Sequence, residues 1–236
     1  KPEALAAATA RAASAKLAHG ANILVKKGDA LIAFNTDGRG CVGYLERTGF
    51  SFDGAKVAIC GTGPTALAIL HAAAIAGVSE VLLLSRDKER AREVLDRYVD
   101  EFGTLAHATV DLQAAVDGHR SFLTAYDETT FKFGSYTTST QAIAAADLVI
   151  NATPLGMREG DPAPFDVSLF HEGQRAFDVV YAHGETAFAA GAKAAGCTFA
   201  DGGGMLVAQA VATVQAVCDV SGIDCELSFD ELFEIM

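Results

Sequence analysis

Tryptophan is absent from the 236 residues, proline occurs only 5 times, and there are only 18 basic residues against 30 acidic ones. The resulting net charge of −12 repels phosphate backbones and anionic lipid surfaces, so we expect neither a nucleic-acid nor a membrane partner. We also expect no bilayer-spanning segment, because no apolar run is evidently long enough. Half of the residues are hydrophobic and 20% are charged, which excludes a disordered chain and predicts a sizeable core.

The cysteines predict neither a disulfide framework nor a metal site. The chain has five cysteines, an odd number, and no C-x-x-C pair. The six histidines show no metal-ligand spacing either, so no metal site is predicted. This cysteine usage favours a reducing compartment, and we expect a cytoplasmic protein.

The first fifty residues predict a small unit of helices and one hairpin. Residues 3–18 are rich in alanine and predict a helix. Apolar runs at 22–25 and 30–34 flank a Lys-Lys-Gly-Asp turn and predict a β-hairpin with Gly28 in the turn. The N-T-D-G segment at 35–38 predicts a capping loop before a helix near 39–47.

From residue 57 the pattern changes to short apolar strands that alternate with helices. Strands at 57–60 and 80–84 enclose a helix at 65–76, and a charged helix follows at 88–102. The alternation resumes with strands near 147–151, 176–180 and 198–200, and with helices near 186–195, 205–220 and 228–235. Such alternation predicts an α/β fold with a parallel, Rossmann-like sheet. We interpret 103–138 as an irregular insertion with one poorly predictable strand.

A glycine turn follows the first strand of this alternation. The G-T-G-P-T-A segment at 61–66 matches the start of a G-x-G-x-x-G/A dinucleotide fingerprint. The helix that follows offers free N–H groups and a positive dipole end to phosphates. The alternative is an ordinary strand-to-helix turn, but the strand–turn–helix–strand context favours a nucleotide site.

The residues after the second strand indicate which nucleotide would bind. An acidic residue there suits the ribose of NAD, whereas arginine suits the 2′-phosphate of NADP. Arg86 and Arg90 are four residues apart and could face one site on the first helical turn. Asp87 beside them is unfavourable for a phosphate, and a solvated helix start would show similar charges. We therefore predict NADP, with NAD as the alternative.

Few polar residues stand out as candidates for proton transfer. Lys1, His19, Asp37, Tyr181 and His183 are the groups that a dehydrogenase could use. By spacing alone, Asp37 is better explained as a helix N-cap than as a catalytic group.

Several segments together resemble one family. The chain carries, in order, N-T-D-G at 35–38, G-T-G at 61–63, N-A-T-P-L-G-M at 151–157, D-V-V-Y at 178–181 and G-G-M-L-V-A-Q-A at 203–210. Their order and approximate spacing are similar to those of shikimate dehydrogenases, over essentially the whole chain outside 103–138. The resemblance implies an NADP-dependent enzyme that reduces 3-dehydroshikimate reversibly to shikimate through a lysine–aspartate pair.

The resemblance also implies roles for particular residues. The catalytic pair would be Asp37, of N-T-D-G, and Lys1, which lies 21 positions before Asn22, as the family lysine precedes its asparagine. Substrate contacts would be Asn22, Tyr181 and Gln209. Cofactor contacts would be Gly61, Gly63, Pro64, Thr65, Arg86, Arg90, Thr153, Met157 and Gly204.

The chain departs from the family pattern in two places. Ile23 stands where the family has threonine, and the family's N-terminal strands with their S-x-S pair have no counterpart in the sequence. We therefore expect a substrate domain of residues 1–48 and 205–236, N-terminally incomplete, beside an NAD(P)-binding domain of 51–204, in a monomer or homodimer. The alternatives are an NAD-dependent quinate/shikimate dehydrogenase and a non-catalytic nucleotide-binding module.

Overall fold

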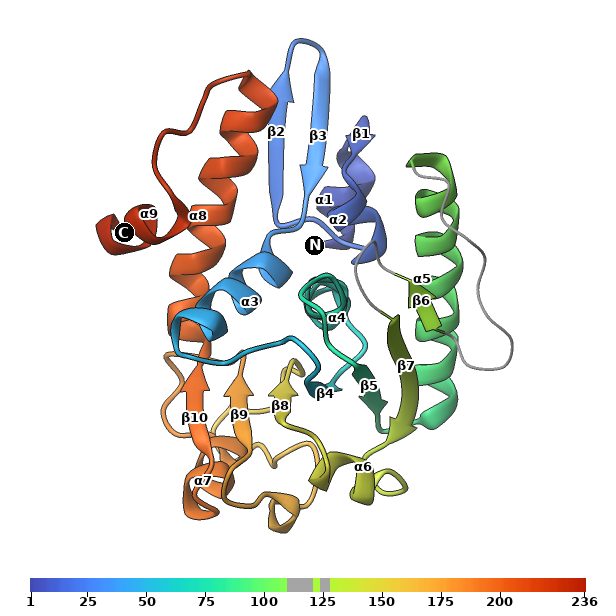
Figure 1. Ribbon diagram of the computed structural model, residues 1–236, viewed down its shortest axis with the longest axis vertical. Coiled ribbons are helices and arrows are strands. Elements are labelled where there is room, and N and C mark those ends of the chain that lie inside the picture. Colours follow the sequence, from blue (N-terminus) through green and yellow to red (C-terminus); the bar gives the residue numbers. More distant parts are fainter. Residues whose placement is uncertain (110–120, 124–127) are drawn as a thin grey trace.

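The computed structural model describes residues 1–109, 121–123 and 128–236, and its strands form two sheets (Figure 1). The strands are β1 (Ala10–Arg11), β2 (Ile23–Lys27), β3 (Ala30–Phe34), β4 (Lys56–Cys60), β5 (Glu80–Ser85), β6 (Ser121–Leu123), β7 (Glu128–Ser135), β8 (Leu148–Asn151), β9 (Arg175–Asp178) and β10 (Thr198–Asp201). The helices are α1 (Pro2–Ala7), α2 (Ala13–Leu17), α3 (Asp37–Arg47), α4 (Pro64–Ile75), α5 (Lys88–Thr109), α6 (Thr140–Ala144), the 3-10 turn η1 (Val167–Leu169), α7 (Ala187–Ala194), α8 (Gly202–Ser221) and α9 (Phe229–Ile235).

The larger sheet confirms the predicted α/β class. Its order is β10-β9-β8-β4-β5-β7-β6, and every pair is parallel except β6 with β7. Counted from β4, the parallel strands follow the 3-2-1-4-5-6 order of a doubly wound nucleotide-binding sheet. The order reverses between β4 and β8, and ligands bind such sheets beyond the carboxyl ends of the strands at this point.

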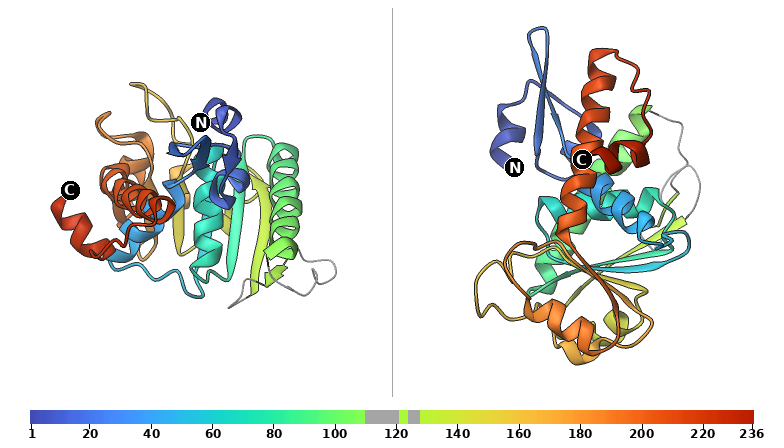
Figure 2. Two further views of the ribbon diagram at one scale, coloured as in Figure 1. Left: turned by 90° about the horizontal axis from the view of Figure 1, so that it is seen from above. Right: turned by 90° about the vertical axis from the view of Figure 1, so that its left-hand side faces the viewer.

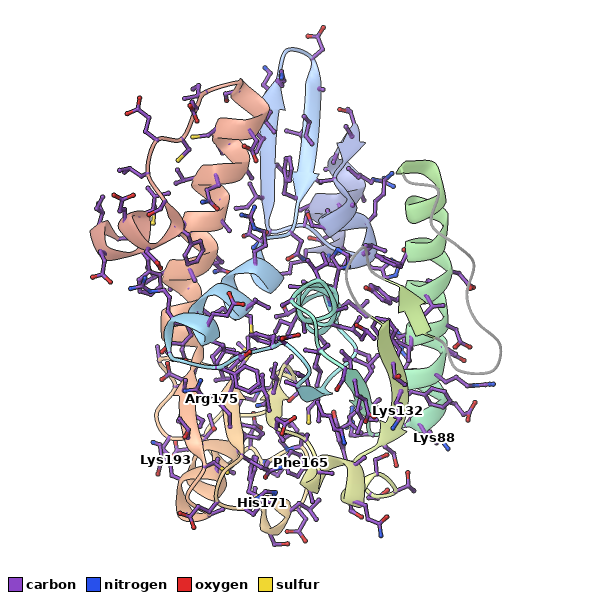
Figure 3. The ribbon with its side chains drawn as sticks, in the orientation of Figure 1. Lys88, Lys132, Phe165, His171, Arg175 and Lys193 are labelled. Carbon is purple, nitrogen blue, oxygen red and sulfur yellow. The ribbon has the colours of Figure 1, made fainter. Side chains whose placement is uncertain are left out.

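Helices cover both faces of this sheet. On one face α3, α4 and α5 bury Leu45, Leu70 and Leu95 in a core with β4, β5 and β8. On the other face the aromatic rings of Phe165, Phe170 and Phe188 pack around η1 and α7, with ring centroids 5.1–6.0 Å apart. Phe165 is labelled in Figure 3. The strands between them are buried on both faces, which explains their unbroken apolar sequence.

The smaller sheet has the order β1-β3-β2, and its antiparallel β2–β3 pair is the predicted hairpin with Gly28 at φ +58°. The prediction of one helix over 3–18 is wrong. The chain is extended from Ala8, and the N–H groups of Thr9 and Ala12 donate to carbonyls of β3. Pairing with β3 therefore overrides the helical preference of alanine and separates α1 from α2.

The prediction of an irregular insertion at 103–138 is also wrong in part. Helix α5 continues to Thr109, and β7 lies inside the sheet, paired with β5 over six residues. The rest of that prediction, at 110–120 and 124–127, falls outside the described residues.

Helix α8 is longer than predicted and connects the two sheets. It begins at Gly202, directly after β10, rather than near Met205, and runs alongside the β2–β3 hairpin (Figure 2). By length and composition it could span a bilayer, which contradicts our expectation that no run is long enough. Only 28% of its apolar stretch is buried inside the protein. One side of the helix packs closely on α3, where a Cβ on Gly40 would lie 2.7 Å from the Gln209 backbone N.

Candidate active site

The Lys1 ammonium forms a direct ion pair with the Asp37 carboxylate, at its Oδ2. Lys1 precedes α1 and Asp37 is the first residue of α3. Asp37 is only 2% exposed, whereas about a third of the Lys1 side chain remains accessible. The spacing-based view of Asp37 as a plain cap is thus incomplete, since its carboxylate faces a cation.

Two further side chains complete the cluster around Asp37. Asn22 donates from Nδ2 to Asp37 Oδ1 over 2.9 Å. The Thr65 hydroxyl donates to Asp37 Oδ2 over 2.9 Å and accepts from Lys1 Nζ over 2.8 Å. Thr65 was predicted from the family resemblance as a cofactor contact, and here its hydroxyl contacts the Lys1–Asp37 pair.

The N-T-D-G segment is held by its own amide and hydroxyl groups. Asn35 accepts from the Asp37 N–H over 3.0 Å and donates from Nδ2 to the Gly20 carbonyl over 2.9 Å. Thr36 donates its N–H to Asn22 Oδ1 over 3.0 Å and accepts from Asn22 Nδ2 over 3.0 Å. Asn22, predicted as a substrate contact, therefore uses both of its N–H donors within the protein.

A small cavity opens beside this cluster. Its volume is about 170 Å³, and Lys1, Asp37, Thr65, Tyr181 and Gln209 contribute to its walls. Three further predicted site residues, Thr65, Tyr181 and Gln209, therefore line the same cavity as the Lys1–Asp37 pair. A larger cavity of about 820 Å³ lies between α3, α4 and α9, and it includes neither Lys1 nor Asp37.

The glycine turn lies at the point where the strand order reverses. Gly61 has φ +115°, and a Cβ on it would lie 2.8 Å from the Ala152 carbonyl after β8, so only glycine fits. A Cβ on Gly63 would meet no atom within 4 Å, which leaves space in front of the α4 N-terminus. Pro64 begins α4, where its missing N–H costs nothing.

Arg86, directly after β5, acts on a buried tyrosine that the sequence did not single out. Burial raises the pKa of Tyr136, while the positive charge of Arg86 and the Gly61 backbone act in the opposite direction.

Asp87, which the sequence analysis found unfavourable for a phosphate, accepts a hydrogen bond from the Glu89 N–H over 3.0 Å at the start of α5. Arg90 lies along its own helix, 3.8 Å from Glu93.

The N-A-T-P-L-G and D-V-V-Y segments are joined by a buried carboxylate. Asp178 is 1% exposed and accepts from Asn151, Thr186 and the Val180 N–H, over 2.9, 2.6 and 3.1 Å. Burial raises its pKa, although these three hydrogen bonds oppose the shift. Thr153 donates from its hydroxyl to Asn151 Oδ1 over 2.6 Å. The network shapes the loop after β8.

Of the predicted cofactor residues, Met157 is exposed and Gly204 is packed against another helix. Met157, in the loop after β8, is 52% exposed. Gly204 faces the ring of Tyr44, where an added Cβ would lie 2.0 Å from Cε2, so glycine is needed there for packing of α8 on α3. No sequence signal separated this packing role from a cofactor role.

Comparison with curated proteins gives relatives of one kind. The chain is 34% identical over 192 residues to shikimate dehydrogenase (NADP(+)) of Moorella thermoacetica, covering 81% of this chain and 57% of the relative. It is 29% identical over 198 residues to quinate/shikimate dehydrogenase of Escherichia coli strain SMS-3-5, covering 83% and 62%. The chain thus spans about 60% of the length of the curated relatives it matches. No protein-family model matches it.

Solved structures show the same fold. The ligand-free 5-ketofructose reductase of Gluconobacter sp. strain CHM43 superposes with a TM-score of 0.69 at 26% identity, covering 99% of this chain and 74% of that one. Shikimate 5-dehydrogenase of Thermus thermophilus, in complex with NADP(H) and shikimate, gives 0.70 at 24% identity, covering 99% and 74%. Over four fifths of its length, the chain is a homologue of the shikimate and quinate/shikimate dehydrogenases.

Proposed function

We propose that the chain belongs to an NADP-dependent dehydrogenase that reduces 3-dehydroshikimate reversibly to shikimate. The observation that carries the proposal is the contact between Lys1 and Asp37 at the wall of the cavity that also holds Gln209 and Tyr181. The names of the curated relatives support the substrate class.

The residues after β4 and β5 fit a dinucleotide. Gly61 allows the sharp turn, Gly63 leaves its Cβ space free, and the first N–H groups of α4 have no acceptor within the helix. Gly61, Gly63 and Pro64 would hold the pyrophosphate, and Arg86 would contact the 2′-phosphate. A reduced nicotinamide supplies a hydride when it is bound.

Lys1 and Asp37 would handle the proton of the reaction. The Lys1 ammonium holds a proton at Nζ, and it releases this proton to the substrate oxygen as that oxygen becomes an alkoxide. In the reverse direction Nζ accepts the hydroxyl proton. Asp37 fixes the direction of Nζ and balances its charge, and Asn22 and Thr65 in turn fix Asp37 through both carboxylate oxygens.

Gln209 and Tyr181 would recognise the substrate hydroxyls. Both line the cavity, and Tyr181 is 40% exposed. A polar wall of this kind rejects an analogue that lacks one hydroxyl, because its own donors and acceptors are then left unpaired. The roles of these two residues follow from the family resemblance and from their place in the cavity.

The test is an oxidation assay on the full-length protein with shikimate and quinate, each with NADP and with NAD. The proposal predicts the highest kcat/KM for shikimate with NADP. A preference for quinate with NAD would support the second candidate, an NAD-dependent quinate/shikimate dehydrogenase. The Escherichia coli relative, by its name, supports quinate as a candidate substrate. Nucleotide binding without turnover of either substrate would contradict both and would leave a non-catalytic nucleotide-binding module.

A further inference from the structure

Thr65 is the member of the Asp37 cluster that comes from the helix after the glycine turn. Lys1, Asn22 and Asp37 belong to the segments around the small sheet, whereas Thr65 is the second residue of α4. Its hydroxyl lies 2.9 Å from Asp37 Oδ2 and 2.8 Å from Lys1 Nζ. One side chain of the nucleotide-binding helix thus contacts both proposed proton-transfer groups.

The hydrogen-bond chemistry of a hydroxyl fits this place between an acid and a base. A threonine hydroxyl has one proton to donate and lone pairs to accept with. It donates to the carboxylate and accepts from the ammonium, so both of its bonds are to charged groups. Such bonds are stronger than those between neutral partners. They restrain the Lys1 side chain, whose four-carbon stem is otherwise flexible.

The backbone contacts around Thr65 leave little freedom to its position. A Cβ on Gly38 would lie 2.1 Å from the Ala68 carbonyl, so α3 and α4 are in direct backbone contact. A Cβ on Gly20 would lie 2.9 Å from Pro64 Cβ and 2.9 Å from Lys1 Cβ. The start of α4 is therefore packed against the same segments that carry Lys1 and Asp37.

We propose that Thr65 is a positioning residue that fixes the Lys1–Asp37 pair relative to the nucleotide-binding turn. This inference rests on the proposed function. Thr65 does not itself exchange a proton with substrate; it holds Nζ and Oδ2 in place from the helix whose N-terminus would face the phosphates. Its loss leaves the pair free to move relative to that turn.

The test compares Thr65→Val, which keeps the shape and removes the hydroxyl, with Thr65→Ser, which keeps the hydroxyl. For Thr65→Val we expect kcat for shikimate oxidation to fall roughly ten- to a hundredfold, the scale of losing hydrogen bonds to charged groups. The affinity for NADP, measured by titration, should stay within about twofold. Thr65→Ser should restore most of kcat. Thr198→Val, at the exposed start of β10, is the matched control and should retain wild-type kcat.

A purely structural role would lower kcat without moving its pH dependence. Removing the hydroxyl withdraws a hydrogen-bond partner from both Lys1 and Asp37, so the pH dependence of kcat should change in Thr65→Val and return in Thr65→Ser. An unmoved profile in Thr65→Val would overturn the inference, whether or not kcat falls, as would loss of kcat in Thr65→Ser equal to that in Thr65→Val.

A second measurement separates this inference from the proposed function. The ¹³Cε resonance of Lys1 is titrated by NMR in the wild type, Thr65→Val and Asp37→Asn, without substrate. A different titration in Thr65→Val supports the positioning role even if the wild type turns over no shikimate. An identical titration in wild type and Thr65→Val would overturn it even if the enzyme is active.

Discussion

Gly38 and Ala68 are in direct backbone contact: a Cβ on Gly38 would lie 2.1 Å from the Ala68 carbonyl oxygen. This contact brings α3 against α4, and it places Asp37 beside Thr65. Glycine is therefore required at this position of N-T-D-G for the packing of α3 on α4, independently of any capping of α3.

Replacing this glycine should affect stability and activity together. Gly38→Ala must separate α3 from α4, and overpacking of this kind costs about 1–3 kcal/mol of unfolding free energy. Urea unfolding and shikimate turnover would show both losses. Gly63→Ala is the control for stability, because its added methyl meets no atom within 4 Å. If Gly38→Ala unfolds at the wild-type urea midpoint, the close contact is not a constraint.

Asp37→Asn tests the charge of the proposed catalytic pair. The amide keeps the size of the side chain but removes the anion that faces Lys1, so kcat should fall by roughly 10²-fold or more. Asp29→Asn makes the same chemical change on the exposed hairpin turn and should leave kcat unchanged. Near-normal turnover in Asp37→Asn would reduce Asp37 to a helix-starting residue.

Arg86→Ala tests the choice between NADP and NAD. Loss of a charge-assisted bond to the 2′-phosphate should weaken NADP binding by about 1.5–3 kcal/mol and leave NAD binding nearly unchanged. Calorimetric titration of both nucleotides measures the difference, with Arg92→Ala, on α5, as the control. Equal losses for NADP and NAD would mean that Arg86 does not recognise the 2′-phosphate.

His71 should make stability depend on pH. Burial between α4 and α5, beside Tyr98 at 3.0 Å, lowers its pKa from 6.5 to about 4. Because the pKa is lower in the folded state, the unfolded chain binds the proton more readily between these values. Stability is therefore fully present above pH 6.5 and is lost as the pH falls towards 4, by at most about 3 kcal/mol.

Urea unfolding at pH 7.5 and pH 5 measures this effect. His71→Gln keeps a hydrogen-bonding side chain but cannot take up a proton, so the difference between the two pH values should be smaller in this variant. An equal pH dependence in the wild type and His71→Gln would assign the effect to other groups.

Sequence patterns predicted the strands whose apolar runs result from burial on both faces of the sheet. Strands β4, β5 and β8 are buried on both faces, and their apolar runs were located to within one residue. Helix and strand were confused at residues 3–18, because the pairing of Thr9 and Ala12 with β3 is a long-range contact that no local propensity records. For the same reason β7 was interpreted as part of an insertion.

The candidate site shows a similar division. Family resemblance selected Lys1 and Asp37, and the structure brings them into contact. Spacing alone favoured Asp37 as a cap, because a carboxylate before a helix looks the same in either role. The contacts of Thr65 with this pair could not be predicted, since they depend on how α4 packs against α3. The assignments of the substrate and cofactor contacts, and the division into two domains, stay predictions.

Helix α8 carries part of the wall of the small cavity, including Gln209. Its first residue is fixed, because a Cβ on Gly202 would lie 2.1 Å from the Val179 carbonyl, and the helix then extends about 30 Å towards the hairpin. Gln209 is only about 10 Å from that fixed end. Gln209 is also held from the side, because a Cβ on Gly40 of α3 would lie 2.7 Å from the Gln209 backbone N. Backbone contacts at both Gly202 and Gln209 therefore fix the wall of the small cavity that carries the proposed substrate contact.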